Sequence, residues 1–300
     1  MKRNISPRSY EKLCFASYLS LFAIVVTGGL VRLTGSGLGC SDWPQCNSEK
    51  FIDVSSMHGA IEQINRLFTG FVAVIVIAAV LGSLFLAERK RSLTRLSLGL
   101  VVGVLAQVVL GGIVVLTGLN PFANMGHFLL SMVLIANAVV LCRHAREGRN
   151  PVSDCSPREK KYLSGIGVLF ALAVISGTVV TATGPHAGDE NAVRFGFEIS
   201  TVARIHGFFV LLSLLALLLV LLKVRKSTNT REFLEQRLAV FLGVGLLQAL
   251  VGYVQYFNGI PVVLVATHLF GAALIWSIAV DTITVSGSGL SRPRSQPLSH

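Results

Sequence analysis

Eight long apolar runs constrain this chain more than any other feature of its sequence. Each run has about the 20 residues that an α-helix needs to cross roughly 30 Å of hydrocarbon. Only 14% of the residues are charged, against about 25% in soluble domains. We therefore predict an all-α integral membrane protein with eight transmembrane helices. Within a few residues, the runs cover 13–33, 67–87, 96–117, 125–142, 162–182, 205–224, 238–256 and 262–283, and the second helix is expected to begin near residue 56.

The basic residues predict how these helices are oriented. Of the 26 Lys and Arg residues, 21 lie before the first run, after the last run, or in alternate segments between runs. Because the cytoplasmic loops of membrane proteins carry the excess of Lys and Arg, we expect a multi-pass protein of the cell membrane with both termini in the cytoplasm. The net charge of +11 is explained by this topology, and we expect no nucleic-acid partner.

An internal duplication divides the chain into two halves. One constant shift along the chain aligns three helices of one half with three of the other, and the first and fifth helices end alike, in "RLTGSG" and "TATGPH", at a slightly different shift. Repeats of four helices each run parallel, which predicts two four-helix bundles related by a pseudo-twofold axis along the membrane normal. The aligned pairs are Gln107 and Gln248, Gly111 and Gly252, His127 and His268, Ile64 and Ile205, Asn65 and His206, and Phe68 and Phe209.

Topology and duplication together predict the domain order. A cytoplasmic N-terminus, the N-terminal bundle with its outer loop, a cytoplasmic linker, the C-terminal bundle and a disordered Ser/Pro/Gly-rich cytoplasmic tail follow one another. These segments are 1–12, 13–143 with the loop at 33–56, 144–161, 162–284 and 285–300. Each bundle is then expected to hold its own site.

Two histidines of the C-terminal half predict a haem site. His206 and His268 fall at the same depth on alternate helices of one four-helix unit. A lone histidine in a membrane helix is usually a hydrogen-bonded core residue, but helix bundles place haem between facing histidines. Zinc is less favoured, since it needs three or four ligands and no Cys or further carboxylate lies nearby. We therefore expect a haem with two histidine ligands here.

The N-terminal half keeps only part of this pair. It has His127, but Asn65 stands where the repeat calls for the second histidine. It gains Glu62 where the other half has Ala203, and His58 where the other half has Ile199. A carboxylate near the hydrocarbon boundary indicates function, although a salt bridge from Glu62 to Arg66 is an alternative explanation. The divergence suggests substrate chemistry in this half and a redox or structural cofactor in the other.

The cysteines divide between the two sides of the membrane. Cys40 and Cys46 lie in the outer loop, where oxidation is allowed, and we expect a disulfide that closes "CSDWPQC". This disulfide is either structural, holding the loop closed, or redox-active. Cys14, Cys142 and Cys155 are expected to be free.

Several long motifs resemble the haem A synthase family. They are "GGLVRLTGSGLGCSDWPQC" (28–46), "IEQINR" (61–66), "LTGLNP" and "HFLLSM" (116–132), "TATGPHAGD" (181–189) and "THLFGAAL" (267–274). The resemblance implies two pseudo-twofold-related four-helix bundles. It also implies an enzyme that oxidises the C8 methyl of haem O to a formyl group by two successive hydroxylations, giving haem A for cytochrome oxidase.

The same resemblance implies roles for the matched residues. His206 and His268 would be the axial ligands of a haem b, His127 a ligand of the substrate haem, and Glu62 the catalytic carboxylate. Cys40 and Cys46 match the family's paired outer cysteines. Arg66 and Arg204 would pair with haem propionates or would be interfacial arginines that reach into the headgroup region. His186 is expected to serve loop structure or to contact a propionate.

Asn65 departs from the family pattern, in which many members have histidine. Since a carboxamide is a poor iron ligand, three arrangements remain for the substrate haem. His127 binds it alone and leaves the sixth position open, or Asn65 hydrogen-bonds a water on the iron, or His58 ligates it from about 10 Å along the helix. We favour the first or the second.

Two other classes of protein are compatible with parts of this pattern. A di-haem membrane electron-transfer protein without substrate chemistry would use histidine pairs, but it predicts symmetric sites. A transporter would use the duplication, but it needs broken helices and a polar midplane. For the synthase we expect the lipid bilayer, haem O, a membrane haem O synthase and an unidentified electron-transfer protein as partners.

Overall fold

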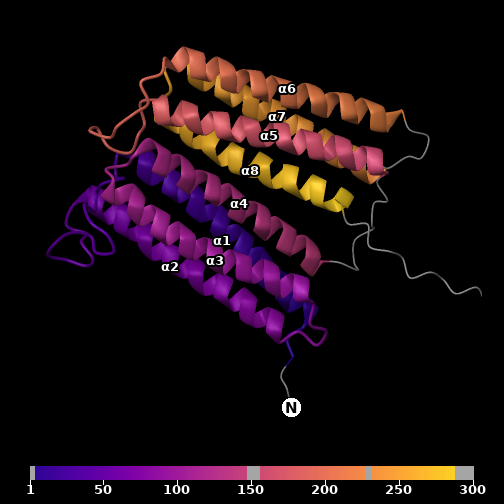
Figure 1. Ribbon diagram of the computed structural model, residues 1–300, viewed down its shortest axis with the longest axis horizontal. Coiled ribbons are helices and arrows are strands. Elements are labelled where there is room, and N and C mark those ends of the chain that lie inside the picture. The colour runs from indigo at the N-terminus through magenta and orange to yellow at the C-terminus, as the bar shows by residue number, and fades with distance from the viewer. Residues whose placement is uncertain (1–3, 147–155, 227–231, 288–300) are drawn as a thin grey trace, which may run out of the picture.

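The computed structural model describes residues 4–146, 156–226 and 232–287, and it confirms the predicted eight helices. All eight are long and apolar enough to cross a membrane. They are α1 (Pro7–Leu33), α2 (Met57–Leu84), α3 (Arg91–Leu116), α4 (Pro121–Ala145), α5 (Pro157–Thr183), α6 (Ile199–Arg225), α7 (Glu232–Phe257) and α8 (Val262–Gly287). Figure 1 shows them as one roughly aligned array, with α1–α4 in its lower part and α5–α8 above.

The helices extend beyond the apolar runs because polar caps start them early. α1 begins at Pro7 after Ser6, whose hydroxyl accepts from the Ser9 N–H. α5 begins at Pro157 after Ser156, which forms a capping box with Glu159. Proline suits the first helical position, where its missing N–H removes no hydrogen bond. At its C-terminal end, α8 continues to Gly287 and so includes the first residues of the predicted tail. The rest of that tail, 288–300, and Cys155 lie outside the described residues.

Each half forms a ring of four helices. In the N-terminal half α1 packs against α2 and α4, and α3 packs against α2 and α4; in the C-terminal half α5 packs against α6 and α8, and α7 against α6 and α8. Among the described residues, the backbones of α2 and α4, and those of α6 and α8, do not approach one another in this way. These diagonal gaps lie between the helices that carry the predicted ligands. The pseudo-twofold relation between the halves stays a prediction.

A seam of apolar side chains joins the two halves. Its buried members come from α1, α4 and α8, which are neighbours in the centre of Figure 1. Trp276 donates its indole N–H to the Met132 carbonyl (2.8 Å), and Phe22 meets Phe270 edge to face with ring centres 5.3 Å apart. The buried apolar residues are Val25, Met132, Ile135, Val139 and Ala273.

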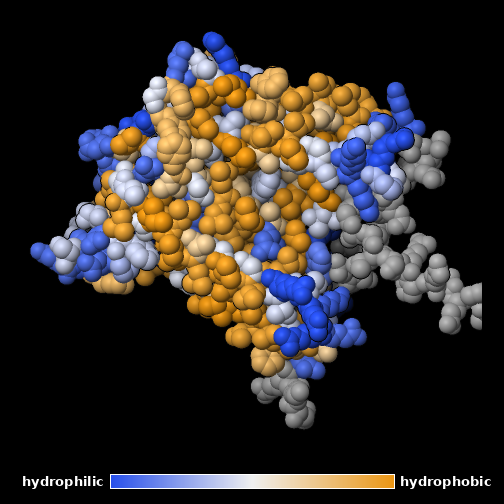
Figure 2. Space-filling model, in the orientation of Figure 1, coloured by the Kyte–Doolittle hydropathy of each residue, from blue (hydrophilic) through white to orange (hydrophobic). Residues whose placement is uncertain are grey.

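The outer surface of the array is apolar. Figure 2 shows an orange apolar band along the helices, with blue polar groups gathered at the two ends. Exposed leucine, valine and phenylalanine side chains are found on the helices of both halves, among them Val74, Leu105, Leu211 and Leu247. Apolar patches of this extent on a helical protein are typical of contact with lipid, so the chain is a multi-pass membrane protein.

One carboxylate joins three helices at the end opposite the long outer loop. Asp281 of α8 forms ion pairs with Arg143 of α4 and Arg237 of α7. The Arg143 side chain is only 12% exposed, so removal of the carboxylate leaves two poorly solvated guanidinium groups close together.

Replacing this carboxylate is expected to destabilise the protein. We expect Asp281→Ala to lower the free energy of unfolding by about 1–3 kcal/mol, since a partly buried ion pair loses its anion while both cations stay. Thermal unfolding in detergent measures the change. The control is Glu235→Ala, which removes a pair to Arg225 whose side chain is 51% exposed. Equal shifts of the two melting temperatures would contradict the interpretation.

Candidate functional site

His206 and His268 meet across the diagonal of the C-terminal half. His206 comes from α6 and His268 from α8, and their ring centres lie 6.4 Å apart with the rings nearly perpendicular. Two imidazoles that share one metal, each with a metal–nitrogen bond of about 2 Å, have ring centres about 6 Å apart. The separation therefore fits a single metal between the rings.

Hydrogen bonds behind the two rings leave their front nitrogens available. The Nδ1 of His206 donates to the Ala173 carbonyl (3.0 Å) and lies 3.2 Å from the Ser176 hydroxyl. The Nδ1 of His268 lies 3.0 Å from the Gln248 amide. Metal-binding histidines usually have one ring nitrogen held in this way. In His206 this leaves Nε2 without a proton and able to hold a metal. In His268, Nδ1 accepts from the Gln248 amide, so Nε2 carries the ring proton and would lose it on binding a metal.

Glycines leave space beside these rings. A Cβ added at Gly177 would lie 3.1 Å from the His206 ring, and one at Gly252 would lie 3.0 Å from the His268 ring. No three His, Cys, Asp or Glu side chains gather into a metal site anywhere in the described part of the chain. The described residues around the pair thus offer a metal two imidazole ligands, and the ring separation and the glycine clearance fit a haem bound between them.

Asn65 in α2 has the surroundings that His206 has in α6. The Thr27 hydroxyl donates to the Asn65 Oδ1 (2.9 Å), and a Cβ at Gly28 would lie 3.9 Å from the Asn65 amide. When the similar endings of α1 and α5 are aligned, Thr27 and Gly28 fall on Ser176 and Gly177, the neighbours of His206. Asn65 therefore has the same kinds of neighbour as His206, but its side chain is a carboxamide and not an imidazole.

His127 in α4 corresponds to His268 in α8. A Cβ at Gly111 would lie 3.4 Å from the His127 ring, so Gly111 leaves space beside this ring as Gly252 does beside the His268 ring. Its Nδ1 is buried and makes no hydrogen bond within the described chain. His127 is therefore the one ring of the three whose rear nitrogen has no protein partner there.

Glu62 is buried among donors near the N-terminal end of α2. Its side chain is 7% exposed. One carboxylate oxygen accepts from Arg66 Nη2 (2.6 Å) and Nε (3.0 Å), and the other accepts from the Cys40 backbone N–H (2.7 Å). The salt bridge considered from the sequence is thus present, but it is buried and is joined by a bond from the outer loop.

Arg66 ties the outer loop to α2. Besides Glu62, it donates to the carbonyls of Asp42 (3.1 and 3.2 Å) and Gln45 (3.1 Å). Since a guanidinium has five N–H donors, these contacts engage all of them. In this conformation the propionate contact expected from the sequence has no donor on Arg66.

The predicted disulfide between Cys40 and Cys46 is confirmed. Its loop carries a second set of internal bonds around Asp53, which accepts from Ser55 and Asn47. These hydrogen bonds, chiefly those from Ser55, lower the pKa of the Asp53 carboxyl to about 2. The loop is therefore ordered by a covalent bond, a guanidinium and a carboxylate that is ionised at neutral pH.

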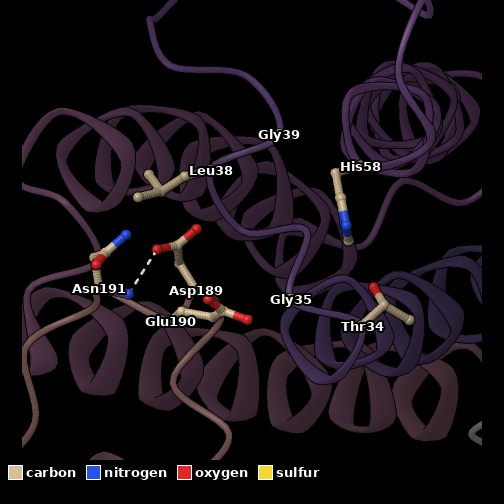
Figure 3. Close-up of a pocket in the computed structure, with 8 residues that line it drawn as sticks. All are labelled: Thr34, Gly35, Leu38, Gly39, His58, Asp189, Glu190 and Asn191. Carbon is tan, nitrogen blue, oxygen red and sulfur yellow. Dashed lines mark hydrogen bonds between the residues drawn. The ribbon is translucent and has the colours of Figure 1, made fainter.

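His58 lies in an outer cavity of about 330 Å³, where Figure 3 shows it opposite Asp189 and Glu190. Its Nδ1 lies 2.9 Å from the Ser36 hydroxyl. The cavity lies between the α1–α2 and α5–α6 connections, which also meet through the Gly37 N–H and the Gly188 carbonyl (2.9 Å). His58 is therefore in contact with the α1–α2 connection through Ser36, and it faces the α5–α6 connection across the cavity.

Arg204 lies near the N-terminal end of α6, and His186 lies in the connection between α5 and α6. Arg204 is exposed, and its charge adds to the hydrogen bonds from Ser200 and Thr201 that lower the pKa of Glu198. His186 Nε2 lies 2.8 Å from the Ile260 carbonyl, so it links two connections, as expected for loop structure.

Sequence reasoning missed the residues that hold the ligands from behind. Gln107 and Gln248 were aligned in the repeat, but their contacts with His127 and His268 were not expected. Thr27 and Ser176 were missed because the α1–α2 connection is longer than the α5–α6 connection, so the shift that aligns the later helices does not align α1 with α5. A separate alignment of these first helices on their similar endings would have paired the two residues.

Comparison with known proteins now identifies the family. A model of the COX15-CtaA family, described as cytochrome oxidase assembly protein, matches residues 11–58 and 51–280. The chain belongs to this family. Proteins named "Heme A synthase" from Bacillus cereus (strain 03BB102) and Bacillus mycoides (strain KBAB4) are each 27% identical to it over 180 residues, which is 58% of this chain. The match spans 57% of the length of these curated relatives.

The role of Arg66 in this COX15-CtaA protein can be tested by a conservative change. Lysine keeps the charge but lacks the planar fork that reaches Glu62 and two carbonyls together. We expect Arg66→Lys to lower the free energy of unfolding by about 1–3 kcal/mol through lost charged hydrogen bonds, and to expose loop 40–46 to protease. The control is Arg204→Lys, at an exposed position. If protease cleaves the loop of Arg66→Lys no faster than that of the wild type, Arg66 does not hold this loop against α2.

Proposed function

We propose that this chain is a haem A synthase, which oxidises the C8 methyl of haem O to a formyl group by two successive hydroxylations. The observation that carries the proposal is the unequal pair of sites. The C-terminal half has two histidines whose ring separation suits one iron. The corresponding place in the N-terminal half has one histidine, an asparagine and a buried carboxylate nearby in sequence. Family membership and the names of the relatives agree with this activity.

The C-terminal half would hold a resident haem b through His206 and His268. When bound, haem b supplies one-electron transfer. Ala173, Ser176 and Gln248 fix the planes of the two rings from behind, which favours a permanent cofactor.

The N-terminal half would bind haem O as substrate through His127. Asn65, held by Thr27, would face the opposite side without binding iron strongly. A position that carries no strong ligand suits a substrate that must leave, and the Asn65 amide can hydrogen-bond a water there. His58 is engaged at Ser36 in the outer cavity, so we do not assign it as a ligand.

Glu62 would act on the substrate as a general base or by stabilising positive charge that develops at the oxidised methyl. Arg66 and the Cys40 N–H hold its carboxylate, and Arg66 offsets the cost of burying the charge. We therefore assign Arg66 as a positioning residue for Glu62. Arg204, which is exposed at the outer end of α6, remains the better candidate for a propionate contact.

The surroundings of the enzyme follow from the same proposal. The protein would lie in the cell membrane with both termini in the cytoplasm, so that the two sites and the disulfide face the outer side. The halves would be related by a pseudo-twofold axis. A haem O synthase in the membrane would supply the substrate, and a separate electron-transfer protein would exchange electrons with the enzyme.

Haem analysis tests the proposed activity. Co-expression of the chain with a source of haem O should yield haem A or hydroxylated haem O in the extracted porphyrins. A folded protein that carries haem and yields neither would exclude the synthase and favour the di-haem electron-transfer alternative.

Two variants serve as controls in the same experiment. Glu62→Gln should keep the haem b spectrum and lower the yield of oxidised haem about 100-fold or more, since it removes an acid–base group. His206→Ala should lose the haem b spectrum. Full activity of Glu62→Gln would refute the assignment of the carboxylate.

The open position opposite His127 predicts a gain of ligation. Because Asn65 has the neighbours of His206, Asn65→His should place an imidazole toward the substrate iron. We expect a second low-spin haem signal in electron paramagnetic resonance, and slower release of bound haem. Asn65→Gln is the control, since it keeps the carboxamide. A spectrum of Asn65→His equal to that of the wild type would show that position 65 does not face the iron.

A further inference from the structure

Arg32, at the C-terminal end of α1, is a partly buried cation whose charge is not balanced by the protein. Its Nη2 donates to the Thr181 carbonyl of α5 (2.7 Å), and this is the only hydrogen bond of the guanidinium within the described residues. Its Nε is buried without a hydrogen-bond partner there. No carboxylate of the described residues forms an ion pair with Arg32.

A second cation increases this imbalance. Arg194, in the α5–α6 connection, acts on Arg32 as a like charge. Each of the three guanidinium nitrogens of Arg194 donates to a backbone carbonyl, and these belong to Gly184, Ala192 and Pro185. A guanidinium that is taken out of water without an anion is costly. Two cations close together, one of which keeps unused donors, therefore favour an anionic ligand at this place.

The position of Arg32 on α1 relates it to both candidate haem sites. Arg32 follows Gly28, the neighbour of Asn65, by four residues, so it lies on the same helix face about 6 Å further along the axis. The alignment that pairs Gly28 with Gly177 also pairs Arg32 with Thr181. The hydrogen bond from Arg32 to Thr181 thus joins equivalent places, each one turn beyond a candidate haem site.

We propose that Arg32 binds a haem carboxylate at this junction of the two halves. This inference rests on the proposed function, in which each half holds a haem. Haem b and haem O both carry propionate groups, and a guanidinium matches a carboxylate with parallel N–H donors. Arg66 has no donor left for this contact, whereas Arg32 uses one nitrogen only. The carboxylate belongs either to the substrate haem or to haem b.

A ligand without charged propionates tests the contact. The full chain, depleted of haem in detergent, is titrated with haem b and with haem b dimethyl ester, and binding is followed in the Soret band. His206→Ala leaves the N-terminal site, and His127→Ala leaves the C-terminal site, so each affinity belongs to one half. In the half whose haem supplies the carboxylate, we expect Arg32→Met to weaken haem b binding about 10–100-fold. Binding of the ester should not change.

Two controls separate this contact from a role in packing alone. Arg194→Met removes a nearby cation whose nitrogens are engaged by carbonyls, so the ratio of the two affinities should stay that of the wild type. Thermal unfolding of the haem-free protein is the second control. If Arg32 only joined the halves through Thr181, Arg32→Met would lower the melting temperature. We expect an equal or higher melting temperature, since the variant removes an unbalanced charge.

Each outcome supports or overturns the contact. A loss of haem b affinity confined to the His206→Ala background assigns the carboxylate to the substrate haem, and a loss confined to the His127→Ala background assigns it to haem b. Equal losses in both backgrounds, equal losses for haem b and its ester, or no loss would overturn the contact.

The same variants separate this inference from the synthase proposal. If Arg32→Met discriminates between haem b and its ester as expected, but co-expression with haem O gives no oxidised haem, the synthase proposal fails and the contact stands. Oxidised haem together with unchanged affinities in Arg32→Met would overturn the contact alone.

Discussion

In a bundle that spans a membrane, every polar side chain must find its partner inside the protein, because hydrocarbon offers none. This constraint governs both candidate sites. His206 and His268 direct one nitrogen of each ring to a fixed partner, which leaves the other toward the gap between α6 and α8. Glu62, though buried, is held by Arg66 and a backbone N–H. Gln107 Oε1 and His127 Nδ1, which have no partner in the described chain, are therefore informative, since burial makes unpaired polar atoms costly.

The buried ion pair of Glu62 and Arg66 joins the site to the outer loop. An isolated buried pair often contributes little net stability, because desolvation offsets the Coulomb attraction. Here Arg66 uses its remaining donors on the Asp42 and Gln45 carbonyls. The disulfide restricts the same loop, and the Cys40 N–H bonds to Glu62. A single guanidinium therefore orients the carboxylate and the loop that covers it, so the longer connection of this half belongs to the site.

The sequence was sufficient to predict the eight helices and to pair the four polar positions between the halves, and insufficient to predict what surrounds those positions. Transmembrane length and the constant shift between the halves depend on local composition and spacing, and both led to His206, His268, His127 and Asn65. The contacts of Arg66 depend on the path of a loop whose contacting residues, Asp42 and Gln45, lie 24 and 21 positions earlier in the sequence. The direction of the Gln107 amide depends on Ser131, one turn beyond His127, and on how α3 meets α4. Such non-local contacts have no periodic signature in a single sequence.

The proposed function would give the two halves of one scaffold different tasks, since one half would keep its haem and the other would exchange it. The scaffold is kept, since Gly28 and Gly177 lie beside the side chains of residues 65 and 206, and Gly111 and Gly252 lie beside the rings of His127 and His268. The differences lie at the ligands and directly behind them. Position 65 on α2 carries a carboxamide where α6 has the imidazole of His206, and α2 has Glu62 where α6 has Ala203. On the proposed function, the carboxamide would hold iron weakly enough for a substrate to leave, and Glu62 would supply the chemistry that the C-terminal half lacks.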